Sequence, residues 1–197
     1  MSDHIIHNME EEREVVFSHS PDPAYLAVVD AASYQFFAVP DLDYDGMLAH
    51  LSKQMLMRTC VAWGCPEKTL TIRLVFTRDH TALESVTQYA SGFQRWVRTA
   101  GRLYFTSHAD LYHCATNRDW TVFSFPRTKS PDVFLSRELV VPAGMYSVIV
   151  FRHFGWFESD QDAPLLGDGT HYTIILRHYP DESHLGRLSP PNSVPWA

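Results

Sequence analysis

The chain has 197 residues, of which 45% are hydrophobic and 13% aromatic, so a packed domain is expected and disorder over the whole chain is excluded. Its formal net charge of −7 excludes general nucleic-acid binding, because that binding depends on lysines and arginines that replace counterions along the phosphates. The same charge favours a basic protein as partner, since complementary potentials speed encounter, although solubility alone would also account for it.

Strands account for most of the predicted secondary structure. Segments rich in aromatic and β-branched residues, several with alternating apolar and polar side chains, are typical of half-buried strands. These segments are 15–17, 25–29, 34–39, 70–76, 103–107, 110–114, 120–125 and 172–177. The run from 139 to 150 predicts a hairpin, because Pro142 and Gly144 favour a tight turn between two apolar stretches.

Two helices are predicted from apolar residues at helical spacing. The stripe of the first consists of Met47, Leu48, Leu51, Met55 and Leu56. This helix is expected to have Asp43 or Asp45 as its N-cap and to end near Trp63-Gly64. The second is expected between Leu83 and Gly101, where apolar residues recur every three or four positions.

The order of these elements predicts an α+β, mainly β fold with an antiparallel, sandwich-like β core and two packed helices. A single β-rich domain is expected over residues 13–179. It would be preceded by an acidic, flexible N-terminus at residues 1–12. Residues 180–197 include Pro190, Pro191 and Pro195 and are expected to form an extended tail, because proline cannot continue a helix or an inner strand.

A cytoplasmic location is expected. The three cysteines, Cys60, Cys65 and Cys114, are too few and odd in number for a secreted disulfide framework. The acidic N-terminal residues lack the apolar region of a signal peptide, and no run of about 18 apolar residues predicts a membrane span.

One acidic motif raises the possibility of a metal site. Asp41, Asp43 and Asp45, followed by Gly46, match the beginning of a calcium loop, in which alternate carboxylates converge on the cation. The twelfth position of such a loop is usually a glutamate and here is Ser52. The alternative is that these carboxylates cap the helix that follows.

Cysteines and histidines suggest two further kinds of site. Cys60 and Cys65, together with His113-Cys114, offer ligands for zinc, and Cys114 near a histidine is one arrangement for a thiol nucleophile. The alternative is that the cysteines are small buried hydrophobes. The motif spacing favours this alternative, so no cofactor is expected.

The segment before the last strand is the predicted partner-binding site. Its aromatic residues suit interface anchors, and its carboxylates suit lysines and arginines on a basic partner. These residues are Phe154, Trp156, Phe157, Glu158, Asp160 and Asp162. The alternative is a solvated connection between two strands.

Two blocks of the sequence resemble the competence protein J family. The first runs from the aromatic segment 32–39 through Val61-Ala62-Trp63-Gly64 to the strand at 70–76, and the second joins 137–146 to Tyr172-Thr173-Ile174-Ile175. The resemblance implies a small acidic protein that binds and inhibits a DNA-entry nuclease by covering its basic active-site groove. It assigns no individual binding residue to this chain.

The sequence therefore predicts a non-enzymatic acidic binding protein, an inhibitor or immunity protein for a basic nuclease or toxin. A metal-dependent or Cys/His enzyme is the first alternative. The second is a self-assembling structural component in which the N-terminal arm and the tail are exchanged between subunits.

Overall fold

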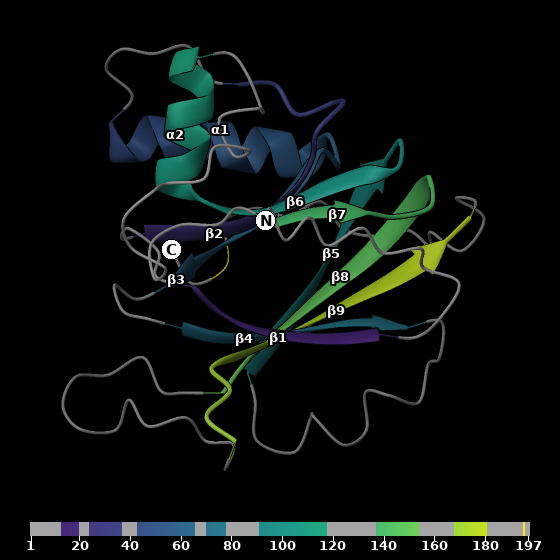
Figure 1. The fold of residues 1–197 in the computed structure, drawn as a ribbon. Helices are drawn as coiled ribbons and strands as arrows, with labels where there is room; N and C mark the ends of the chain where they lie inside the picture. Colours follow the sequence, from purple (N-terminus) through teal and green to yellow (C-terminus); the bar gives the residue numbers. More distant parts are fainter. Residues whose placement is uncertain are drawn as a thin grey trace, which may run out of the picture.

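The computed structural model describes residues 13–19, 24–36, 43–65, 70–77, 91–117, 137–153, 168–180 and 195, which form two β-sheets and two helices (Figure 1). The five-stranded sheet has the order β1-β4-β9-β8-β5, and the four-stranded sheet has the order β3-β2-β6-β7. The strands are β1 (Arg13–His19), β2 (Ala24–Asp30), β3 (Cys60–Cys65), β4 (Leu70–Thr77), β5 (Ser91–Thr99), β6 (Arg102–Ser107), β7 (Arg137–Val140), β8 (Gly144–Arg152) and β9 (Tyr172–Tyr179). The helices are α1 (Tyr44–Leu56) and α2 (His108–Asn117).

These elements confirm the predicted α+β, mainly β class. Every strand pair is antiparallel except β4 and β9, which run parallel with Ile72 opposite Tyr172. The strands predicted at 15–17, 25–29, 70–76, 103–107 and 172–177 lie within β1, β2, β4, β6 and β9. The parallel pair places the beginnings of β4 and β9 at the same end of the sheet, which matters for the site below.

The main core lies between the two sheets. Alternate residues of β4, β8 and β9 face alternate residues of β2, β3 and β6, as the period of two in each strand requires. Trp63 is fully buried there, with ring centroids 6.2 Å from both Phe93 and Phe105. Each large apolar side chain buried in this way contributes about 1.5–3 kcal/mol to folding.

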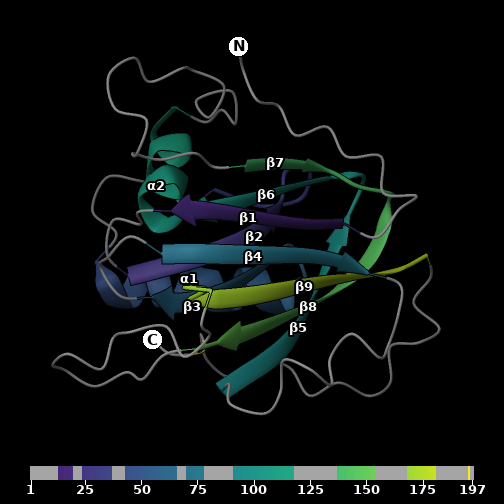
Figure 2. The ribbon, with the colours of Figure 1, turned by 60° about the horizontal axis from the view of Figure 1, so that its bottom comes forward.

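Both helices cover the outer face of the four-stranded sheet (Figure 1). Met47, Leu51 and Met55 of α1 and Leu111 of α2 pack in one buried cluster with the outward-facing residues of β2 and β3. The five-stranded sheet faces the opposite way, and Figure 2 shows its strands in order with both helices behind them. Among the described residues, neither helix is long and apolar enough to cross a membrane.

The second predicted helix is wrong where the structure describes it. Residues 91–99 form β5, which pairs with β8 along its whole length, while residues 83–90 lie outside the described residues. Phe93 and Val97 share one face of the strand, because a spacing of four fits a period of two as well as a helix. Pairing with β8 and burial between the sheets therefore decide in favour of a strand.

The first helix ends earlier than predicted. It stops at Leu56, and Arg58 adopts a left-handed conformation with φ of 59°, which turns the chain back toward the sheet. Residues 60–65, predicted as the end of the helix, form β3 instead. Every residue of β3 is buried, so its apolar run is that of a strand covered on both faces.

The segment 110–114, predicted as a strand, lies in α2. The amide of Asp110 donates a hydrogen bond to Ser107 Oγ over 3.4 Å, and this contact caps the beginning of the helix. Leu111 and Ala115, four residues apart, then face the same cluster on the sheet. Helical packing therefore accounts for a segment whose local composition suggested a strand.

The predicted hairpin at 139–150 is also wrong. β7 pairs with β6, whereas β8 pairs with β5 and β9, so the turn at Pro142 carries the chain from one sheet to the other. Residues 34–36 are not a strand, because the amide of Tyr34 bonds to the carbonyl of Asp30 in a turn. Residues 37–39 and the strand predicted at 120–125 lie outside the described residues.

Candidate functional site

A polar cluster lies on the outer face of the five-stranded sheet, where β8 ends and β4 and β9 begin. Its residues are Arg73, His153, Asp168, Thr170 and Thr173. Arg73 and Thr173 are direct partners in the parallel pairing of β4 with β9, and both alternate with residues of the main core. The sheet register therefore brings together residues that are about 100 positions apart in the sequence.

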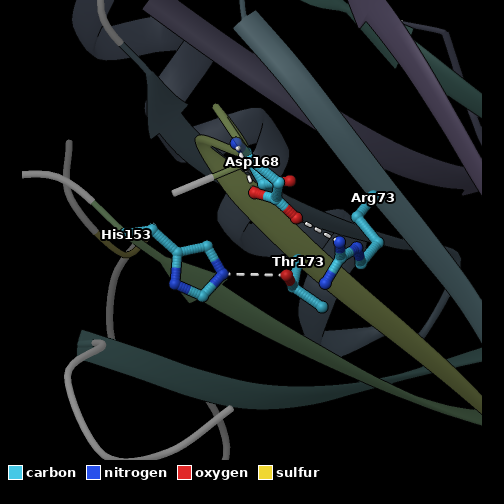
Figure 3. Close-up of polar contacts among 5 residues, drawn as sticks. Arg73, His153, Asp168 and Thr173 are labelled. Atoms are coloured by element: carbon cyan, nitrogen blue, oxygen red, sulfur yellow. Dashed lines mark hydrogen bonds and ion pairs between the residues drawn. The ribbon is translucent and has the colours of Figure 1, made fainter. Parts of the chain in front are cut away.

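His153 is the most buried ionisable group in the polar cluster. Only 1% of its surface is exposed, and its Nε2 lies 2.8 Å from Thr173 Oγ1 (Figure 3). Burial and the nearby Arg73 guanidinium lower the pKa of His153 below its usual value, while Asp168 opposes this shift more weakly. The imidazole is therefore uncharged near neutral pH.

Arg73 and Asp168 form an ion pair beside His153 (Figure 3). The backbone amide of Thr170 donates to Asp168 Oδ1 over 3.0 Å, and this bond, with the Arg73 charge, lowers the pKa of Asp168. The side chain of Asp168 is 44% exposed, so solvent screens the ion pair and it contributes at most about 1 kcal/mol. Its effect is to fix the turn before β9 against β4.

His171 ties the ends of the three strands together. The amide of Thr71 donates to His171 Nδ1 over 3.0 Å, and the amide of His171 donates to the Thr71 carbonyl over 2.9 Å. The amide of His153 donates to the His171 carbonyl over 2.9 Å. The residues that flank 154–167 are therefore held on one part of the sheet, His153 through its backbone amide and Asp168 through its carboxylate.

The polar cluster holds the ends of the strands together and does not expose a nucleophile. Thr173 is only 1% exposed and its hydroxyl is engaged by His153, so neither side chain can reach a substrate. The three cysteines are also buried. Burial raises the pKa of Cys60 well above its usual value, which disfavours the reactive thiolate.

The zinc arrangement considered above is not formed by Cys60 and Cys65. Cys60 packs with the helices on the outer face of β3, and Cys65 packs in the core between the sheets. One ion cannot take both thiolates, because they lie on opposite faces of the strand. Within the ranges that the structure describes, no three His, Cys, Asp or Glu side chains form a group that would hold a metal.

The two predicted binding segments are placed differently. Asp43 is the N-cap of α1, where its Oδ1 accepts from the amide of Gly46 over 2.8 Å, and Asp45 is exposed in the first turn. Asp41 lies outside the described residues, so the calcium site stays a prediction. The predicted partner-binding residues, Phe154, Trp156, Phe157, Glu158, Asp160 and Asp162, also lie outside the described residues and stay a prediction.

Sequence reasoning missed the polar cluster itself. His153 directly precedes the segment 154–162 that the sequence singled out, and Asp168 follows that segment further along the chain. Arg73 and Thr173 belong to strands that were predicted from their apolar residues alone. The signal that joins them is the parallel register of β4 and β9. That register depends on tertiary packing and leaves no local pattern in the sequence.

Comparisons with known proteins show the fold. No protein-family model matches the chain, and no curated protein matches it significantly. A solved structure described as "Crocagin biosynthetic gene J" is similar with a TM-score of 0.51 and 16% identity, over 85% of this chain and 97% of that one.

A second solved structure is that of ComJ from Bacillus subtilis, an inhibitor of the DNA-degrading activity of NucA. It matches with a TM-score of 0.47 and 9% identity over 86% of this chain and 99% of that one. At 16% identity the first of these two matches describes the fold and not the activity.

Proposed function

We propose that this chain is a non-enzymatic binding protein that engages a basic protein partner through the segment 154–162. A nuclease is the class of partner we propose, and inhibition by covering its active-site groove is the proposed action. The observation that carries the proposal is that His153 and Asp168, which flank residues 154–167, are both held on the sheet by the polar cluster. A binding loop held by a rigid scaffold loses less conformational freedom when it binds.

The composition of the segment supports this proposal. Glu158, Asp160 and Asp162 supply carboxylates, which form charge-assisted hydrogen bonds with the lysines and arginines that otherwise hold phosphates. Phe154, Trp156 and Phe157 supply aromatic rings of the kind that anchor protein interfaces. The net charge of −7 would speed the approach of a basic partner at low salt.

The resemblance to the competence protein J family supports the choice of a nuclease as partner. Such an enzyme needs a basic groove to hold nucleic acid, and an acidic loop competes for the same groups. Buried cysteines and a closed His–Thr pair give no comparable support to the enzyme alternative.

The test is capture of partners by the tagged protein from its native lysate at low and at high salt, followed by identification of what is bound. Two variants carry the same charge change. Asp160→Lys with Asp162→Lys alters the proposed site, and Glu10→Lys with Glu11→Lys alters the acidic N-terminus; each pair brings the net charge from −7 to −3. We expect the first pair to slow association by about tenfold or more at low salt and the second to slow it far less.

Equal effects of the two variants would show that only the overall charge matters and would remove segment 154–162 from the site. Recovery of the protein alone would favour the self-assembling alternative, which light scattering on the eluted protein then measures directly. If a nuclease is recovered, its activity on DNA should fall as the wild-type protein is added and recover with the first variant.

A further inference from the structure

The same end of the five-stranded sheet contains two histidines, and at both of them the closed arrangement favours an uncharged ring. His153 directly follows β8 in the chain, and His171 lies directly before β9. His171 connects the start of β9 to β4, which lies about 100 positions away in the sequence, and His153 connects the end of β8 to β9. Neither has a part in the proposed contact with a partner.

His171 can make its hydrogen bond in one protonation state only. Its Nδ1 accepts from the backbone amide of Thr71 over 3.0 Å, and a backbone amide can only donate. The neutral ring must therefore carry its proton on Nε2 and keep the lone pair on Nδ1. Protonation of Nδ1 places two N–H groups against each other and removes this link to β4.

The surroundings of His153 disfavour a positive charge on its imidazole for a different reason. The ring is 1% exposed, and the charged groups that act on it are Arg73 on β4 and Asp168 before β9. His171, whose carbonyl accepts from the His153 amide, is a further titratable neighbour. Arg73 repels an imidazolium, and only Asp168, itself paired with Arg73, attracts it. Burial opposes the charge further.

We propose that His153 and His171 form a pH-sensitive clamp, which holds the ends of β8 and β9 against β4 at neutral pH and releases them on acidification. The direction follows from proton linkage. Burial disfavours the charge on His153, and the Thr71 amide needs the lone pair on His171 Nδ1, so both rings take up protons more readily when released and the closed state loses stability as the pH falls below about 6.5. Each such imidazole favours release by up to about tenfold for each further pH unit.

Hydrogen exchange of backbone amides, followed by NMR, tests the clamp without any partner. The amides of Thr71, His153 and His171 report on the three hydrogen bonds of the clamp, the first to the His171 ring and the other two to backbone carbonyls. The amide of Arg98, bonded to the Arg58 carbonyl over 2.8 Å on the β5 side of the molecule, is the reference. Between about pH 7.5 and 5.5 we expect the protection factors of the three amides to fall at least about tenfold relative to Arg98.

A double variant removes titration but keeps the hydrogen bonds. In His171→Asn the amide oxygen stands in for Nδ1, and in His153→Gln the amide group stands in for Nε2. We expect this variant to keep its protection at low pH. His178→Gln is the matched control, since His178 donates to the Ala143 carbonyl at the other end of the sheet, and it should respond to pH as the wild type does.

Protection of the three amides that stays constant relative to Arg98 in the wild type would overturn the clamp, and this comparison needs no variant. A double variant that folds and loses protection with pH as the wild type does would overturn it too. The consequence for partner binding rests on the proposed function. If the amides respond to pH but the Asp160 and Asp162 variant binds normally, the clamp stands and the proposed binding segment fails.

Discussion

Single residues control the passage from one sheet to the other. Gly144 begins β8 with φ of +147°, and the turn before it is held by two side chains. Tyr146 Oη donates to the Pro142 carbonyl over 3.0 Å, and His178 Nε2 donates to the Ala143 carbonyl over 3.1 Å. The turn therefore depends on a conformation that favours glycine and on side chains from two strands of the five-stranded sheet.

Substitution of Gly144 by alanine should destabilise the protein more than the same change at Gly169. A Cβ at Gly144 would lie 2.7 Å from His178 Nε2 and 2.8 Å from the Tyr179 carbonyl oxygen, in addition to the strain of the positive φ. Gly169, with φ of +81°, has no atom within 4 Å of its added Cβ, so only the backbone strain remains.

We expect Gly169→Ala to cost about 1 kcal/mol and Gly144→Ala about 2–4 kcal/mol in the free energy of unfolding. Urea denaturation of both variants beside the wild type measures the difference. Equal losses would mean that His178 moves away at no cost and that the turn is not held by it.

At the scale of elements, sequence patterns predicted strands that carry their own alternation and missed those decided by packing. β4 alternates strictly between buried and half-buried residues along most of its length, and it was predicted from that pattern. In β5, Arg95 lies between Phe93 and Val97 on the face toward the core, and this charged residue made the segment look helical. α2 shows the reverse. Its aromatic and apolar composition favoured a strand more strongly than its short buried face favoured a helix.

The polar cluster could not be predicted for a related reason. The acidic and aromatic composition of 154–162 drew attention to the segment between β8 and β9, but nothing local indicates that Arg73 lies beside Asp168. That contact requires the parallel pairing of two strands that are separated by nearly half of the chain. Sequence periodicity specifies the faces of a strand and not its neighbours.

Capping of α1 provides a prediction for a single element. The carboxylate of Asp43 accepts from the Gly46 amide, which otherwise lacks a partner within the helix. Asp43→Ala should lower the free energy of unfolding by about 1 kcal/mol, and Asp43→Asn, which keeps an acceptor, by only a few tenths. Asp45→Ala controls for loss of a charge near the helix N-terminus and should cost less than Asp43→Ala.

Thermal unfolding of these variants with and without calcium separates capping from metal binding. If Asp43 acts as a cap alone, calcium leaves the unfolding midpoint of every variant unchanged. A calcium-dependent rise that is lost in both alanine variants would instead establish the predicted calcium loop.

The whole molecule depends on contacts between distant parts of the chain. β9 is the third strand of five and pairs with β4 on one side and β8 on the other. Tyr172, its first residue, also reaches the other sheet, where its hydroxyl lies 3.4 Å from the Gly64 carbonyl. The amide of the same Gly64 donates to the Pro195 carbonyl over 2.8 Å, so Pro195 is tied to the edge strand β3.

Two truncations distinguish these contributions. Removal of residues 172–197 takes out a central strand and its core residues Ile174 and Leu176, so we expect a chain that does not fold, with no cooperative urea transition.

Removal of residues 181–197 keeps every described strand and takes away the Pro195 bond to β3, so we expect a folded chain that is less stable by about 1 kcal/mol. In that shorter chain the amide of Gly64 should exchange faster while the amide of Arg98 keeps its protection. Complete unfolding of the shorter chain would show that the tail belongs to the domain and that the predicted boundary near residue 179 is wrong.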